Sequence, residues 1–112
     1  MLSLSPACRY YLYFQAADMR KGFDSLCALV RDELGKDPLN GDVFIFLNRR
    51  RNQVKLLQWD KDGFGLYWKR LEKGTYEHPL KEGAELTPRE LMLILQGVFL
   101  RSVRIRKRFS GV

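Results

Sequence analysis

The chain has 112 residues, with 20 Lys and Arg against 13 Asp and Glu, which gives a formal net charge of +7. This length suits one domain with one modest core, and it disfavours an enzyme built around a cleft between domains. The 46% hydrophobic and 12% aromatic content excludes a disordered chain. The longest apolar runs, such as Leu91–Leu95, have five residues and fall far short of the roughly 20 residues of a membrane span, so we expect a soluble protein without a membrane partner.

The cysteines and the N-terminus indicate the compartment. Cys8 and Cys27 are too few for a disulfide framework, and the single histidine, His78, cannot complete a zinc site of about four ligands. The segment Met1–Arg9 has neither the basic start nor the long apolar stretch of a secretory signal. We therefore expect free thiols, a reducing cytoplasm and no cofactor.

The first third of the chain predicts a strand followed by a helix. Aromatic and branched residues alternate over Arg9–Phe14, which is typical of a strand. Apolar residues then recur at helical spacing from Phe23 to Leu34, and Asp18, just before Met19, is the predicted N-cap because its carboxylate can accept from the first-turn amides. Gly35 supplies the stop signal.

The middle of the chain predicts a meander. An apolar run over residues 42–47 suits either a central strand covered on both faces or a tightly packed edge of the core. Residues 53–59 alternate, with Val54 and Leu56 on one face and Lys55 and Leu57 on the other. The turn Asp60–Gly63 is a hairpin signal, after which residues 64–71 resume a strand, and a further short strand is predicted around Tyr76.

The C-terminal third holds the best local signal in the chain. Thr87 as N-cap, Pro88 at the first helical position and Glu90 at the third predict a helix that runs to about residue 99 or 100. We therefore expect an α+β domain over residues 1–100, with a mostly antiparallel sheet of about four to five strands, one helix in its N-terminal half and one C-terminal helix. Residues 101–112 form a basic tail that is either a frayed strand or unordered until it meets a partner.

Positive charge is concentrated in two places. The tail carries five of the basic residues, Arg101, Arg104, Arg106, Lys107 and Arg108, and the rest of the chain has a second cluster at Arg49, Arg50, Arg51 and Lys55. Such clusters attract polyanions, because each phosphate contact releases condensed counterions. Nucleic acid is the expected partner. The alternative for the tail alone is that it keeps the domain soluble or touches an acidic protein.

Several other residue patterns fit a structural role as well as a functional one. Asp60 and Asp62 would need a third carboxylate to hold Mg²⁺, and aspartates that flank a glycine turn more often bond their own backbone. Arg20 and Lys21 near a helix start are candidates for phosphate binding, although Asp18 opposes an anion there. Three aromatic residues at strand spacing, Trp59, Tyr67 and Trp68, are more typical of a core than of base stacking. No catalytic arrangement is predicted.

A series of short motifs resembles a known family. The motifs are Asp18–Asp24 (DMRKGFD), Asp37–Gly41, Val43–Phe46, Arg49-Arg50, Lys55–Leu57, Trp59-Asp60, Asp62–Phe64 and Lys69–Glu72, in that order along residues 9–100. Together they resemble the transposase-accessory protein (TnpB, second open reading frame) of the insertion-sequence family numbered 66. The resemblance implies a small bacterial protein encoded beside a larger DDE-type transposase, which assists transposition without a well-defined molecular role. The basic extension does not belong to every member of that family.

The expected function follows from the charge and the resemblance together. We expect a non-enzymatic accessory protein that binds transposon-end or target DNA, with Arg49, Arg50, Arg51 and Lys55 on its phosphates and Arg104, Arg106, Lys107 and Arg108 along the same backbone. The alternative is an adaptor that binds the transposase, or another protein of the element, without contacting DNA.

Overall fold

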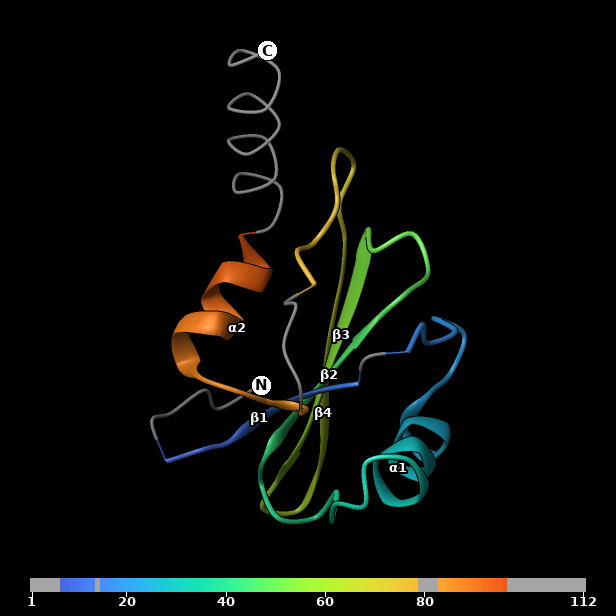
Figure 1. Ribbon diagram of the computed structural model, residues 1–112. Coiled ribbons are helices and arrows are strands. Elements are labelled where there is room, and N and C mark those ends of the chain that lie inside the picture. Colours follow the sequence, from blue (N-terminus) through green and yellow to red (C-terminus); the bar gives the residue numbers. More distant parts are fainter. Residues whose placement is uncertain (1–6, 14, 79–82, 97–112) are drawn as a thin grey trace, which may run out of the picture.

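The computed structural model describes residues 7–13, 15–78 and 83–96, which form a sheet with two helices (Figure 1). In chain order the elements are β1 (Tyr10–Tyr13), α1 (Phe23–Asp32), β2 (Val43–Leu47), β3 (Gln53–Asp60), β4 (Gly63–Arg70), β5 (Glu85–Leu86) and α2 (Pro88–Leu95). The strand order is β4-β3-β2-β1-β5, and every neighbouring pair except β1 and β2 is antiparallel. The predicted α+β class with a mostly antiparallel sheet is confirmed.

The exception to antiparallel pairing is the β1–α1–β2 unit. Tyr10 pairs with Val43 and Tyr13 with Phe46 in parallel register, with α1 between the two strands in the sequence. Parallel neighbours need such a crossover because a tight turn cannot join them. As a consequence β1 and β2 end at the same edge of the sheet, and the segments that follow them lie side by side.

The two helices cover opposite faces of the sheet (Figure 1). On the face that we call the α1 face, Leu26 and Val30 of α1 pack with residues such as Phe44 and Leu57. On the other, the α2 face, Leu91 and Ile94 pack with residues that include Ile45 and Leu56. Every residue of β2 is buried, as a central strand between two helical layers requires. The predicted alternation of β3 between the two faces is also confirmed.

The long β3–β4 hairpin places β4 at an edge of the described sheet. The turn has two residues, Lys61 and Asp62, because Asp60 pairs with Gly63, and Lys61 takes a positive φ of 59°. The turn therefore lies within the predicted segment, with Gly63 as the first residue of β4. From Tyr67 onward β4 is exposed.

The helix starts differ in how well the sequence predicts them. The capping box of α2 is confirmed, since Glu90 N–H donates to Thr87 Oγ1 at 3.1 Å and Thr87 N–H donates to Glu90 Oε1 at 2.9 Å. The N-cap prediction for Asp18 is wrong. Helix α1 begins at Phe23 behind Gly22, which has no side chain to cap it, while Asp18 accepts the backbone N–H of Arg20 at 2.9 Å. Gly35 follows the helix with a φ of 64°, as predicted.

The segment after β4 departs from prediction. Tyr76 is not in a strand: it lies in an irregular segment, its ring is buried in the core on the α2 face, and its N–H donates to Arg51 O at 2.6 Å. The remaining strand is Glu85–Leu86, which pairs antiparallel with β1. The predicted end of the last helix and the tail over 101–112 lie outside the described residues.

Candidate nucleic-acid interface

The turn between β2 and β3 presents the arginine cluster. Asn48 and Asn52 close it, because Asn48 Nδ2 donates to Asn52 Oδ1 at 2.7 Å and Gln53 N–H donates to Asn48 Oδ1 at 2.9 Å. Arg51 N–H donates to Asn48 O at 3.0 Å, and Arg51 takes a positive φ of 57°. The backbone of this turn is thus fixed by its own hydrogen bonds, while Arg49 and Arg50 are exposed.

A second loop supports the turn from the side. Leu71 N–H donates to Asn52 O at 2.7 Å, and Tyr76 N–H reaches Arg51 O. The same antiparallel register brings the end of β4 to this edge, with Arg70 opposite Gln53 and Lys69 opposite Val54. Lys69 and Arg70 therefore extend the basic surface of the arginine turn. Neither residue was predicted from the sequence to bind nucleic acid, although the hairpin register would have placed both at this edge.

An open hollow lies at the carboxyl ends of β1 and β2. It has a volume of about 370 Å³ and is lined by residues after each strand together with His78: Gln15, Ala16, Leu47, Asn48, Arg49, Arg51 and His78. Ligands of sheets with parallel strands often bind at this edge. Two guanidiniums that border one hollow suit an anionic group, because the planar fork of arginine matches phosphate oxygens.

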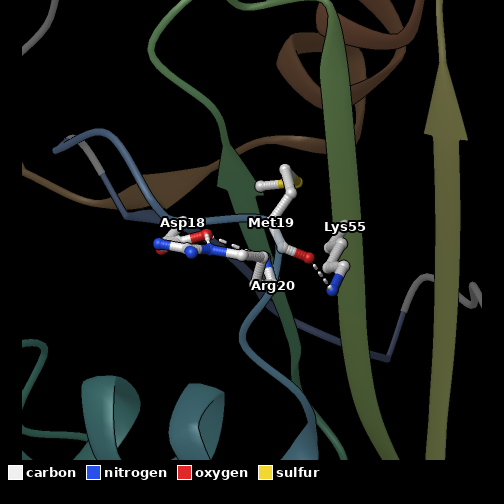
Figure 2. Close-up of polar contacts among 4 residues, drawn as sticks. All are labelled: Asp18, Met19, Arg20 and Lys55. Carbon is white, nitrogen blue, oxygen red and sulfur yellow. Dashed lines mark hydrogen bonds and ion pairs between the residues drawn. The ribbon is translucent and has the colours of Figure 1, made fainter.

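Lys55 lies apart from this exposed surface. Its side chain is 3% exposed on the α1 face, and Nζ donates to Met19 O at 2.7 Å (Figure 2). Nζ also donates to Lys21 O at 2.7 Å. The ammonium also sits 4.1 Å from the centre of the Trp68 ring. Burial lowers the pKa of Lys55, and Asp18 opposes that shift. The ammonium thus binds two backbone carbonyls, and the DNA contacts proposed below do not include it.

Arg20 and Lys21 lie in the loop that Lys55 holds. Arg20 pairs with Asp18 at 2.7 Å, through exposed side chains (Figure 2). The guanidinium of Arg20 and its backbone N–H together lower the pKa of Asp18 to about 2. Helix α1 starts only at Phe23, so the two basic residues precede its first turn. The hydrogen bond from Lys55 Nζ to Lys21 O brings this loop close to β3. The charge of Arg20 is already paired with the carboxylate of Asp18.

The aromatic residues of the hairpin do not share one surface. Trp68 is 56% exposed and lies opposite Lys55 on the α1 face, whereas Tyr67 pairs with Leu56 and is exposed on the α2 face. Trp59 is half-buried, with its ring 5.0 Å from that of Phe64 in an edge-to-face arrangement. The expectation that all three belong to the core is wrong for Trp68 and Tyr67, because β4 is an edge strand.

A family model and two relatives place the chain among known proteins. The family model described as "IS66 Orf2 like protein" matches residues 8–105. This chain belongs to the IS66 Orf2-like family. Two proteins of Sinorhizobium fredii (strain NBRC 101917 / NGR234) are similar to it: y4jC is 35% identical and y4hO 33% identical over 100 residues, which are 88% of this chain and 86% and 87% of the relatives. No solved structure matches the chain at a significant level.

Membership makes the protein an accessory protein of insertion-sequence transposition. The family match extends through most of the sequence, including the arginine turn and the loop that Lys55 holds. The tail residues Arg104, Arg106, Lys107 and Arg108 lie outside the residues that the structure describes.

Two further findings concern sites in this IS66 Orf2-like protein. Over residues 7–13, 15–78 and 83–96, no group of three or more His, Cys, Asp or Glu side chains could hold a metal ion. Asp60 ends β3 and Asp62 lies in the hairpin turn, where Asp62 N–H donates to Asp60 O at 2.6 Å. Within the same described parts, neither helix is long and apolar enough to cross a bilayer.

Proposed function

We propose that this protein is a non-enzymatic accessory factor that binds DNA through the arginine turn at one end of its sheet. The observation that supports this proposal is the hydrogen-bonded turn, which holds Arg49 and Arg50 exposed beside Lys69 and Arg70. A turn already fixed by its backbone loses little conformational entropy when it binds. Its guanidiniums contact phosphates of transposon-end or target DNA, and the choice of sequence is left to the transposase.

The first experiment is a salt series on DNA binding. Binding of the purified protein to its own transposon-end duplex and to a scrambled duplex is measured, and the variant R49Q/R50Q/R51Q is compared. Each phosphate contact contributes about 0.9 to the slope of log affinity against log salt, so neutralising three should reduce that slope by about 3. The reduction should be the same for both duplexes, because phosphate contacts carry no sequence information.

The matched control is R31Q/K61Q/R89Q, which removes the same charge from exposed positions away from the arginine turn. It should leave most of the salt slope in place. If both triple variants lower the slope equally, net charge alone drives binding, and the assignment to the turn is wrong. If the wild-type protein binds neither duplex at moderate salt, DNA binding itself is wrong.

An adaptor role is the second candidate, and the edge strand supports it. In the described sheet β4 pairs only with β3, so its outer edge offers backbone groups for an added strand, and Tyr67 is exposed beside it. In this role the protein joins the transposase or another protein of the element. A pull-down with transposase that persists without DNA and at high salt would favour the adaptor over the DNA-binding factor.

A further inference from the structure

We propose that Trp68 is a stacking platform for an unpaired base, so that the DNA bound by this protein includes single-stranded nucleotides. This inference rests on the proposed DNA-binding function and specifies the kind of DNA. Its starting point is the high exposure of a tryptophan on an edge strand, beside a basic turn. Such a side chain exposes a large apolar surface that a ligand can cover.

Two contacts hold the Trp68 indole in place. Its Nε1–H donates to Gln53 Oε1 at 2.8 Å, and the Lys55 ammonium lies 4.1 Å from the ring centre. Lys55 is itself fixed by the carbonyls of Met19 and Lys21, which anchors the arrangement to the loop before α1. An exposed aromatic ring that is already ordered pays little entropy when a ligand stacks on it.

The position of Lys55 determines which ring face is available. A cation above the ring centre occupies one face of the indole, so the exposed area belongs to the opposite face and the outer edge. A nucleobase stacks on such a face, and the interaction tolerates every base because each has a π-face. In a duplex, both faces of each internal base are covered by neighbouring pairs. The platform therefore selects unpaired bases.

The surroundings of Trp68 fit a nucleotide. Trp68 lines an open hollow of about 290 Å³ with Gln53, Arg70 and Glu72. This volume is near the lower end of the roughly 300 to 1,000 Å³ typical of small-molecule sites, which suits a single base rather than a large ligand. Arg70 Nε donates to Glu72 Oε2 at 3.0 Å between exposed side chains. The carboxylate of Glu72 opposes an anion, so the phosphates of the strand should run along the other side of Arg70.

Charge complementarity favours a nucleic acid over a protein as the occupant. Gln53, which accepts the hydrogen bond from Trp68, directly follows the arginine turn in the protein chain. A DNA strand with one base on Trp68 therefore lies near the exposed Arg49 and Arg50. Single-strand binders combine these elements, a basic track for phosphates and aromatic rings for bases. Here the arginine turn provides the basic track, and Trp68 of the adjacent β3–β4 hairpin provides the aromatic ring.

The test uses the full-length chain with Trp59→Phe, which leaves Trp68 as the only tryptophan. Oligo(dT) and a duplex of equal length are titrated at moderate salt while tryptophan fluorescence and affinity are recorded. We expect oligo(dT) to quench Trp68 fluorescence. Trp68→Leu should weaken oligo(dT) binding about tenfold to a hundredfold and leave duplex affinity within about twofold. Trp68→Phe keeps an aromatic face and should restore part of the loss.

Each outcome decides between the two proposals. Duplex binding that depends on the arginine turn, with no quenching by oligo(dT) and no effect of Trp68→Leu, overturns the stacking platform and leaves the DNA-binding function in place. Failure to bind either DNA overturns both. Loss of transposase binding in Trp68→Leu, with oligo(dT) affinity unchanged, assigns the surface to a protein partner and overturns the platform. Equal unfolding midpoints for Trp68→Leu and its parent chain exclude misfolding as the cause of the lost binding.

Discussion

Lys55 joins two parts of the molecule that are distant in the sequence. It binds carbonyls of residues 34 and 36 positions away, in the loop before α1. A buried lysine normally costs free energy, and here two charge-assisted hydrogen bonds and the Trp68 ring offset the cost. Removing the ammonium would leave the carbonyls of Met19 and Lys21 without this donor. Lys55 therefore joins the loop before α1 to the Trp68 ring on β4.

Tyr76 is a buried polar residue that, unlike Lys55, lacks hydrogen bonds within the described part of the chain to offset the burial of its polar group. Its side chain is 1% exposed, and its hydroxyl makes no hydrogen bond with any of the described residues. Burial, together with Tyr67, raises the pKa of Tyr76 to about 12. An unpaired buried hydroxyl costs about 1 to 3 kcal/mol, so Tyr76→Phe should raise the free energy of unfolding by about 1 kcal/mol, measured by urea titration.

The control for this prediction is Tyr13→Phe. The hydroxyl of Tyr13 donates to Glu33 Oε1 at 3.2 Å, so its removal should lower stability by about 1 kcal/mol instead. If Tyr76→Phe destabilises as much as Tyr13→Phe, the Tyr76 hydroxyl has a partner and the prediction is wrong.

At the scale of elements, the two helix starts predict opposite responses to mutation. Thr87→Ala removes the side-chain acceptor of the α2 capping box and should cost about 1 kcal/mol of stability. Gly22→Ser adds a cap to α1, where Gly22 has an extended backbone and a Cβ would meet no atom within 4 Å. It should stabilise by about 0.5 kcal/mol, through the cap and through a less flexible unfolded chain. Urea unfolding of both variants measures the difference, and a shift in the same direction would contradict it.

The sequence predicts those elements whose signals are local. The capping box of Thr87 and Glu90 and the alternation of Val54 and Lys55 depend on residues that are close in the chain, and both are confirmed. The prediction for Asp18 was wrong because α1 starts only at Phe23, and Asp18 instead accepts the backbone N–H of Arg20 and pairs with its guanidinium. An N-cap signal does not show which of these two local structures an aspartate forms.

The candidate site was predictable in part. The arginine turn follows from three consecutive arginines between two predicted strands. The burial of Lys55 could not be predicted, because its partners are backbone carbonyls that only the tertiary fold brings near. The exposure of Trp68 depends on β4 being an edge strand, and periodicity within a strand does not give the strand order.

Over the whole molecule, charge is distributed unequally between the two ends of the sheet. The end with the arginine turn also carries Lys69 and Arg70. The opposite end has the hairpin turn, where Asp60 and Asp62 outnumber Lys61, and the loop that leads into β2 adds acidic residues there, since Val43 pairs with Gln58 near that turn. Such a distribution orients the protein toward a polyanion during approach and raises the association rate at low salt.

The tail should strengthen this field without adding sequence preference. Residues 101–112 carry +5 of the net charge of +7, so a chain ending at Leu100 retains +2. Neutralising Arg104, Arg106, Lys107 and Arg108 to Gln in the full chain should lower the salt slope by up to about 4, because each phosphate contact contributes about 0.9. The affinities for transposon-end and scrambled duplex should fall together, as measured in parallel titrations. A loss of affinity for the transposon-end duplex alone would instead assign base readout to the tail. An unchanged salt slope in both the four-Gln variant and the chain ending at Leu100 would confine DNA binding to the arginine turn and its neighbours.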